Sequence, residues 1–198
     1  KGVQDATLRR ATDMMGRQVN VMVRLVDDLL EVSRITRDKL ELRREPIEMT
    51  AVIASAVETS RPLVDAARLR LTLTLPPEHL VVEGDSVRLA QVFSNLLNNA
   101  TKYTEPGGEI TLTVWRDGDE VAASVRDTGV GIPSEMLPRV FDMFTQVERT
   151  TDRAQGGLGI GLTLVKRLVE MHGGTVTANS GGTGTGSEFV VRVPLRTG

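Results

Sequence analysis

The sequence of 198 residues lacks three features that would narrow its function at once. It contains no cysteine, which excludes disulfide bonds and thiolate metal sites and suits a reducing compartment. It has neither a secretory signal nor an apolar run of the roughly 18 residues that span a bilayer, so we expect this segment to make no membrane contact. Its 24 basic and 26 acidic residues form no block of one sign, so we expect no nucleic-acid partner.

The first 45 residues predict one long helix that precedes a separate domain. Apolar residues recur on a heptad seam over about four heptads, which favours a dimerising or hairpin arm over an ordinary helix lying on its own domain. Pro46 marks the expected boundary between an arm of residues 1–45 and a domain of residues 46–198. One seam position holds Leu8, Met15, Met22, Leu29 and Thr36, the other holds Ala11, Gln18, Leu25, Val32 and Lys39, and Val19 and Val26 widen the stripe.

After Pro46 the pattern changes to short strands and helices. Several connections are too short for crossovers, so we expect a two-layer α/β sandwich whose mixed, mostly antiparallel sheet packs on about three helices. Asp85 is the predicted cap of the second helix, and Asp117-Gly118 predicts a hairpin turn. The predicted helices cover residues 50–67, 85–103 and 159–171, and the predicted strands cover 47–49, 68–75, 80–83, 109–116, 120–127, 175–179 and 187–194.

Asn95, Asn99 and Lys102 form the first candidate site. They follow one another at i, i+4 and i+7, so they share one flank of the predicted helix, beside its apolar face. An amide oxygen can coordinate Mg²⁺ and a lysine can meet a phosphate, so the trio suits a triphosphate. Taken alone, this spacing favours an ordinary solvated helix flank.

Two glycine-rich segments shift that balance towards a nucleotide. Residues 127–132 (DTGVGI) directly follow a predicted strand, and residues 156–162 (GGLGIGL) directly precede a predicted helix. Glycines let the backbone approach a ligand, and a helix N-terminus offers N–H groups and a positive dipole end to an anion. The Asp127 carboxylate, at a strand end, can accept a hydrogen bond from an exocyclic amine such as adenine N6. Each segment alone is weak, and the second matches neither the P-loop nor the dinucleotide fingerprint.

The order of these motifs resembles that of sensor histidine kinases. Residues 95–104 (NLLNNATKYT), 127–131 (DTGVG), 141–144 (FDMF) and 157–162 (GLGIGL) resemble the N box, the first glycine box, the F box and the second glycine box of that family, and residues 184–189 (GTGSEF) resemble its third glycine element. Residues 25–34 (LVDDLLEVSR) and 39–42 (KLEL) resemble the second helix of its dimerisation and phosphotransfer hairpin. The resemblance implies the ATP-binding fold that these kinases share with DNA gyrase.

The resemblance also implies a role for each matching residue. Asn99 would hold the Mg²⁺ that bridges the ATP phosphates, with Asn95 and Lys102 as the catalytic residues beside it. Asp127 would bind adenine. Residues 133–156 would form a lid, with Phe141 and Phe144 packing it and with Arg149 and Arg153 as solvated charges or γ-phosphate ligands. The other implied nucleotide-binding residues are Tyr103, Gly129, Gly131, Ile132, Gly157, Leu158, Gly159, Gly161, Leu162 and Ser187.

Asn95 also bears on the implied reaction. In the related hydrolases this position, four residues before the Mg²⁺ asparagine, holds a glutamate that acts as a general base. An amide cannot accept a proton near neutral pH, which favours transfer of the γ-phosphoryl group over hydrolysis. The family's acceptor histidine belongs to a first hairpin helix that we expect before Lys1, and His79 and His172 resemble surface or capping residues. We therefore expect ATP binding, no phosphoacceptor in this chain and no self-phosphorylation.

The resemblance implies partners outside the chain. These are the receiver domain of a response regulator and, in the full-length protein, a second copy joined through the hairpin, in the cytoplasm of a bacterium, whether or not the parent is anchored in a membrane. Two other functions stay open. A degenerate module that binds nucleotide only for regulation is disfavoured by the intact boxes, and a serine kinase of the anti-sigma type is disfavoured by residues 25–34.

Overall fold

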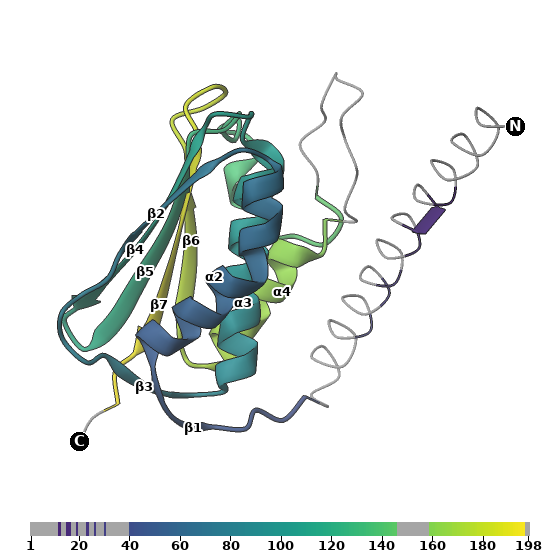
Figure 1. Cartoon of the computed structure of the whole chain (residues 1–198). Coiled ribbons are helices and arrows are strands. Elements are labelled where there is room, and N and C mark those ends of the chain that lie inside the picture. The colour runs from purple at the N-terminus through teal and green to yellow at the C-terminus, as the bar shows by residue number, and fades with distance from the viewer. Residues whose placement is uncertain are drawn as a thin grey trace, which may run out of the picture.

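The protein is a two-layer α/β sandwich, as the sequence predicts. The computed structural model describes residues 40–145 and 159–196, together with Thr12, Met15, Gly16, Val19, Val23, Val26 and Leu30. Three helices form one layer and a five-stranded sheet forms the other (Figure 1). The elements in chain order are β1 (Glu45–Glu48), α2 (Met49–Ala66), β2 (Arg70–Thr74), β3 (Val81–Gly84), α3 (Ser86–Tyr103), β4 (Glu109–Asp117), β5 (Glu120–Asp127), the short 3-10 helix η1 (Leu137–Arg139), α4 (Gly161–Met171), β6 (Thr175–Asn179) and β7 (Ser187–Pro194).

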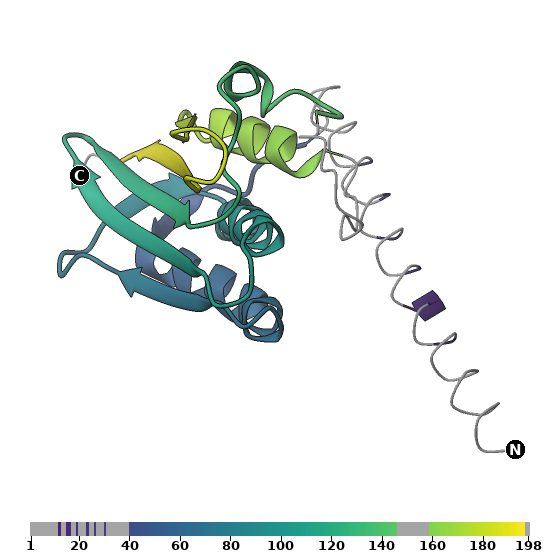
Figure 2. The same cartoon turned by 90° about the horizontal axis from the view of Figure 1, so that it is seen from above.

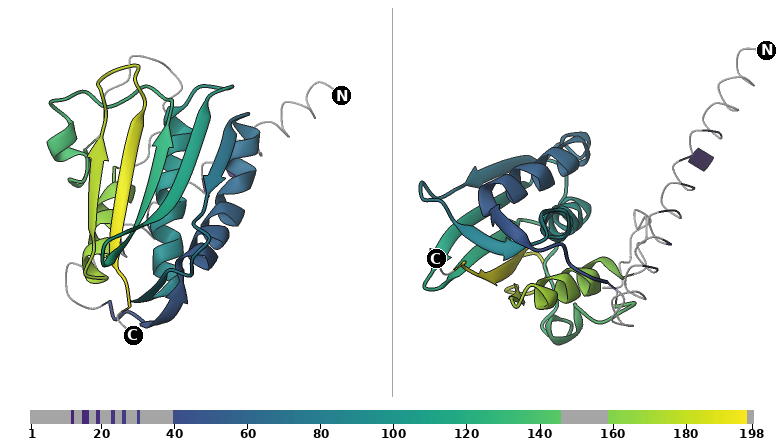
Figure 3. Two further views of the ribbon diagram at one scale, coloured as in Figure 1. Left: turned by 90° about the vertical axis from the view of Figure 1, so that its left-hand side faces the viewer. Right: turned by 90° about the horizontal axis from the view of Figure 1, so that it is seen from below.

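The large sheet is mixed and mostly antiparallel, again as predicted. Its strand order is β2-β4-β5-β7-β6, with β2 parallel to β4 and the other three neighbours antiparallel. Strands β1 and β3 form a separate antiparallel pair, which the sequence did not predict. All three helices cover the same face of the large sheet, as the view from above shows (Figure 2). No described helix covers the opposite face (Figure 3, left).

One core lies between the sheet and the helices. In β4, the buried side chains Ile110, Leu112 and Val114 alternate with partly exposed ones, which is the period of a strand with one face inward. In α3, the buried residues instead recur every three or four positions, so one side of the helix is packed and one flank stays accessible. These α3 residues are Leu89, Val92, Phe93, Leu96, Leu97 and Ala100.

Two local predictions can be compared with the structure directly. Asp85 caps α3 as expected, because its side chain accepts a hydrogen bond from the Arg88 N–H group at 3.1 Å. The β4–β5 hairpin also forms, but its loop is Gly118-Asp119 instead of the predicted Asp117-Gly118. Asp117 already pairs with Glu120, and Gly118 takes the positive φ of 65° at the first loop position, where a glycine is favoured.

The arm is described at only seven positions. These seven residues are helical, and Met15, Val19, Val23, Val26 and Leu30 are each more than half exposed. The other predicted seam residues lie outside the described part of the chain, so the seam and the domain boundary at Pro46 stay predictions. Among the described residues, no helix combines the length and the apolar character needed to cross a bilayer.

His172 is the C-cap residue of α4, which confirms the capping alternative that the sequence suggested, and its side chain is buried instead of lying on the surface. Its side chain is enclosed between α4 and the start of α3, where the backbone N–H of Asp85 donates to Nε2 at 3.0 Å. Because that N–H can only donate, Nε2 is unprotonated, and Nδ1 therefore carries the proton and donates it to the Leu168 carbonyl at 2.7 Å. Burial is the largest effect and lowers the pKa of His172 below 6.5. The hydrogen bond to the Leu168 carbonyl opposes it, and the smaller effects of Arg44 and Asp85 lower and raise the pKa respectively.

The free energy of unfolding is expected to fall as the pH drops below 6.5, in part because of His172. The unfolded chain protonates this imidazole near pH 6.5, while the folded chain resists protonation until the pH reaches its lowered pKa. Over that interval the unfolded state binds more protons, so acid favours unfolding. In urea unfolding measured above and below pH 6.5, the free energy of unfolding of His172→Gln should therefore fall less in acid than that of the wild type. His79→Gln should retain the full loss of the wild type, because the His79 side chain is 92% exposed. Equal acid losses in the wild type and in His172→Gln would contradict this account.

Candidate nucleotide site

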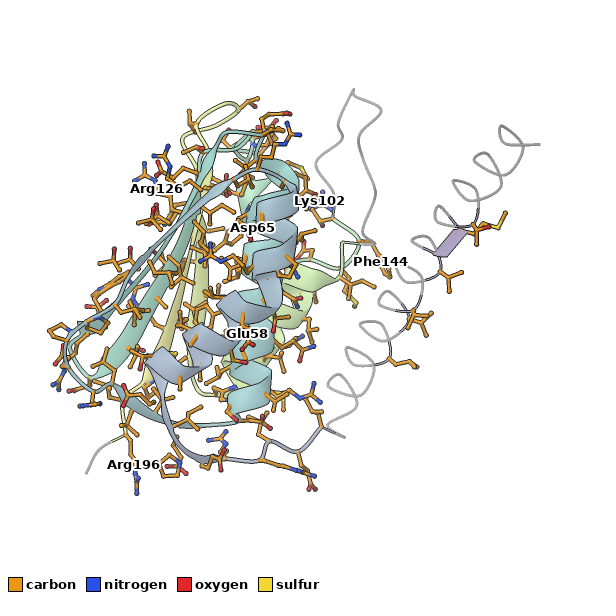
Figure 4. All side chains as sticks on the ribbon, viewed as in Figure 1. Glu58, Asp65, Lys102, Arg126, Phe144 and Arg196 are labelled. Atoms are coloured by element: carbon orange, nitrogen blue, oxygen red, sulfur yellow. The ribbon has the colours of Figure 1, made fainter. Side chains whose placement is uncertain are left out.

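Asn95, Asn99 and Lys102 lie along the flank of α3 that the core does not use. Asn95 and Asn99 are half-buried, while Lys102 is exposed with its Nζ 4.8 Å from the ring centroid of Tyr103. Lys102 lies near the C-terminal end of the helix, at the top of the helix layer (Figure 4). The Asn95 Nδ2 group is buried without a hydrogen-bond partner among the described residues. Leaving such a donor unpaired costs about 1–3 kcal/mol. An unpaired buried donor therefore indicates a group whose partner is a ligand or water.

Asp127 ends β5 and is almost fully enclosed, with 3% of the residue exposed. Its Oδ1 accepts hydrogen bonds from the N–H groups of Gly129, at 2.8 Å, and Ser187, at 3.3 Å. Its Oδ2 accepts one from the Ser187 hydroxyl at 2.5 Å. A carboxylate has about four acceptor positions, so the protein occupies three of them and leaves one on Oδ2. The arrangement can accept one further hydrogen bond from a ligand amine.

The first glycine segment links Asp127 to the end of α3. The Val130 N–H donates to the Tyr103 carbonyl at 3.1 Å, and Gly129 lies so close to that carbonyl that a Cβ would collide with it. Gly131 has a φ of 71° and abuts the carbonyl of Gly182 in the β6–β7 loop. Glycine is therefore required at both positions by backbone approach, and the segment is held between α3 and the β6–β7 loop.

The N-terminus of α4 is open in the way an anion site requires. The helix starts at Gly161, two residues later than predicted, because Gly159 has a φ of 69° that no α-helix contains. No side chain caps it, and its first three N–H groups have no partner within the helix. A Cβ on Gly161 would meet no atom within 4 Å, so the side-chain direction of this residue is open within the described part of the chain.

These features gather around the C-terminal half of α3. The two helices pack on each other, and the hydrogen bond between Asp85 and His172 places the end of α4 at the start of α3. The start of α4 lies about 15 Å from its His172 end, because a helix rises about 1.5 Å per residue. The two helices run in opposite directions, so the start of α4 lies towards the C-terminal half of α3 (Figure 1). The Tyr103–Val130 hydrogen bond brings Asp127 to the same end of α3.

The two aromatic residues of the F box differ in their exposure, and their predicted packing of the lid stays a prediction because residues 146–156 lie outside the described residues. Phe141 is half-buried and meets Phe189 edge to face, with ring centroids 6.2 Å apart. Phe144 is 61% exposed and packs on no core residue, because its positive φ of 64° turns it outward, beyond α4 (Figure 4). Its N–H donates to the Gly159 carbonyl at 3.2 Å. The predicted site residues Gly157 and Leu158, and the predicted lid residues Arg149 and Arg153, lie outside the described residues.

The remaining predicted positions surround this arrangement. Ile132, the last residue of the first glycine segment, is buried, with 8% of its surface exposed. Leu162 is half-buried in the first turn of α4 and packs against the core. The sequence did not single out Ser180, whose hydroxyl bonds to the backbone of Ile132 and Gly186. A serine after a strand predicts a local turn at most, so no sequence signal pointed to this contact between loops.

Residues 84–197 match the model of the family described as histidine kinase-, DNA gyrase B- and HSP90-like ATPases. The chain belongs to this family. Its relatives include the circadian input-output histidine kinase CikA of Synechococcus elongatus, which is 36% identical over 178 residues, or 89% of the chain and 24% of that protein. Another is the sensor histidine kinase RcsC of Escherichia coli, also 36% identical, over 94% of the chain and 20% of that protein. The chain therefore spans a quarter or less of the length of these relatives.

Solved structures of kinases share the fold of this family member. The histidine kinase AdeS of Acinetobacter baumannii is 25% identical, with a TM-score of 0.74, over 91% of the chain and 82% of that structure. Full-length ShkA in complex with AMPPNP is 30% identical, with a TM-score of 0.77, over 89% of the chain and 36% of that structure. The chain is thus an ATP-binding domain of the sensor histidine kinase type. The names of these relatives favour neither a serine kinase nor a purely regulatory module.

Proposed function

We propose that the chain binds Mg²⁺-ATP and transfers the γ-phosphoryl group to a histidine supplied from outside the described residues. The observation that carries this proposal is the convergence of three groups on the C-terminal half of α3. These are the enclosed Asp127 carboxylate with one free acceptor position, the unpartnered Asn95 amide and the uncapped start of α4. The carboxylate suits an amine, the Asn95 amide suits the polar region of phosphates and metal, and the helix start suits an anion. Mg²⁺-ATP contains all three parts.

Each group has a chemical role in this proposal. Asp127 accepts a hydrogen bond from adenine N6, and the open N–H groups at Gly161 bind phosphate oxygens. Asn99 holds Mg²⁺ through its side-chain oxygen, beside Asn95 and Lys102 on the same flank. Magnesium bound in this way keeps several waters. The phosphates supply most of the negative charge around it, so it needs no cluster of carboxylates from the protein. The described residues contain no such cluster.

Transfer is favoured over hydrolysis by the residue at position 95. Water attack on the γ-phosphorus needs a general base, and an amide does not accept a proton near neutral pH. An imidazole needs less assistance because it is itself a nucleophile. One ring nitrogen bonds to the γ-phosphorus, the bond from that phosphorus to the bridging oxygen of ADP breaks, and the imidazole loses its N–H proton to solvent. The protein's part is positioning and charge stabilisation.

Neither histidine of the chain fits the acceptor role. His172 is buried at the far end of α4 from Gly161, and both of its nitrogens already bond to backbone groups. His79 lies on the surface between β2 and β3 beside Glu48, close to the start of α2. The acceptor therefore comes from another segment. In the parent protein this proposal includes an arm of residues 1–45 paired in a dimeric hairpin and relay of the phosphoryl group to the receiver domain of a response regulator.

The test is phosphoryl transfer in trans. The chain is incubated with Mg²⁺ and γ-labelled ATP, alone and with a histidine-bearing helical hairpin from the parent protein. We expect an acid-labile label on the hairpin, none on the chain, and little release of free phosphate. Asn99→Ala should reduce the labelling at least tenfold, since it removes the proposed metal ligand, whereas Asn98→Ala on the same helix should retain it. Label on His79 or His172, or rapid phosphate release without the hairpin, would contradict the proposal.

A further inference from the structure

Ser180 joins the two loops that flank Asp127. It directly follows β6 and begins the β6–β7 loop of residues 180–186. Its hydroxyl oxygen accepts a hydrogen bond from the Ile132 N–H at 2.9 Å, and its proton goes to the Gly186 carbonyl at 2.7 Å. One side chain therefore connects the first glycine segment, residues 127–132, to the residue that precedes Ser187.

The hydroxyl uses all of its hydrogen-bonding capacity at this position. A serine hydroxyl has one proton and two acceptor positions. The N–H groups of Ile132 and Gly182, the latter at 3.3 Å, occupy the acceptor positions. The Gly186 carbonyl takes the proton, since the alternative acceptor on Gly182 is longer, at 3.4 Å. Each of these bonds goes to the backbone of a loop.

The bonds of Ser180 continue to the Asp127 carboxylate on both sides. On one side, Gly186 is followed by Ser187, whose hydroxyl and N–H both donate to Asp127. On the other side, Ile132 ends the glycine segment whose Gly129 N–H donates to the same carboxylate. Two backbone bonds run parallel to this link, from Gly186 N–H to the Gly129 carbonyl and from Gly184 N–H to the Val130 carbonyl, at 3.0 and 2.6 Å.

We propose that Ser180 is a positioning residue for adenine recognition. By holding residues 127–132 against residues 184–187, it keeps the Ser187 donors on Asp127 and leaves the last acceptor position of that carboxylate directed at the nucleotide. Ser180 acts through Ser187 and Ile132, and its side chain needs no contact with ATP. This inference rests on the proposed function, because it gives Ser180 a part in the binding of the adenine ring.

The test compares three single variants by calorimetric titration with Mg²⁺-ATP and with inosine triphosphate, which has no 6-amino group. Ser180→Ala should raise the Kd for ATP about tenfold, the equivalent of one hydrogen bond, and should narrow the preference for ATP over inosine triphosphate. Ser180→Thr keeps the hydroxyl and should restore both values. Thr185→Ala is the matched control, because its hydroxyl donates to Gly182 at 2.7 Å within the same loop and does not reach the glycine segment. It should change the Kd less than twofold.

Hydrogen exchange of the nucleotide-free chain separates the failure of this inference from that of the proposed function. The Ile132 amide should exchange faster in Ser180→Ala than in the wild type. In Thr185→Ala its exchange rate should equal that of the wild type. If the wild type bound no ATP, the proposed function would fail. If it bound ATP while Ser180→Ala kept the wild-type Kd and preference, the role of Ser180 would be overturned. An equal loss of affinity for both nucleotides would also overturn it, since that result indicates a general structural role.

Discussion

Asp127→Asn is expected to weaken ATP binding by roughly ten- to a hundredfold while leaving the fold intact. A hydrogen bond to a charged group contributes about 1.5–3 kcal/mol, and each 1.4 kcal/mol changes a Kd tenfold. The asparagine oxygen can still accept from the N–H groups of Gly129 and Ser187, and its Nδ2 can donate to the Ser187 hydroxyl in place of accepting from it. The local network survives, but a donor now faces the amine of adenine.

The Asp127 prediction has an internal check on its cause. In calorimetric titrations, the wild type should prefer ATP to inosine triphosphate, and Asp127→Asn should lose that preference. Asp119→Asn is the control of equal chemistry, because Asp119 lies exposed in the β4–β5 turn and its side chain makes no hydrogen bond or ion pair within the described structure. It should bind ATP as the wild type does. An unchanged Kd in Asp127→Asn would remove the basis for adenine recognition by this carboxylate.

Gly186→Ala is expected to cost about 2–5 kcal/mol of the free energy of unfolding. A Cβ at this position would collide with the backbone carbonyl of Asp127, and the φ of 74° is itself unfavourable for alanine. The left-handed conformation accounts for about 1–2 kcal/mol, and forced displacement of packed neighbours for about 1–3 kcal/mol. Because the neighbour that must move is Asp127, ATP affinity should fall as well.

Gly184→Ala separates the two contributions. Gly184 lies in the same loop with a similar φ of 82°, but a Cβ there would meet nothing within 4 Å. Only the conformational cost remains, so we expect a loss of about 1–2 kcal/mol and nearly normal ATP affinity. The measurement is urea unfolding with unchanged m-values. If the two variants were destabilised equally, the contact between Gly186 and Asp127 would have no energetic significance.

The sequence predicted most of the fold because its strong signals are local. Helix α3 has both a capping aspartate and a long apolar period, and β4 alternates between buried and partly exposed positions before a glycine-containing turn. These signals act over a few residues and are visible without tertiary structure. The separate β1–β3 pair was not predicted, since four-residue strands carry too little periodicity to show which strand they join.

The candidate site was predictable residue by residue but not in its connections. Asn95 and Asn99 were identified by their spacing on one flank of a predicted helix, and Asp127 by its position between a predicted strand and a glycine-rich segment. The contacts that hold them come from distant segments, such as Ser180 on Ile132 and His172 on Asp85, separated by 48 and 87 residues. The exposure of Phe144 was equally invisible in the sequence, since it accompanies a positive backbone φ that no local pattern indicated.

The pairing of β5 with β7 places Asp127 directly opposite Ser187, at the last position of that ladder. Side chains alternate between the two faces of a sheet, so a slip of one residue would turn Ser187 away from Asp127 and replace it by a neighbour of the wrong face. The same slip would move Phe189 off its partner Phe141 and out of the core. The proposed adenine contact and the core packing thus require the same register, so binding of ATP through Asp127 would itself report that β5 and β7 are aligned correctly.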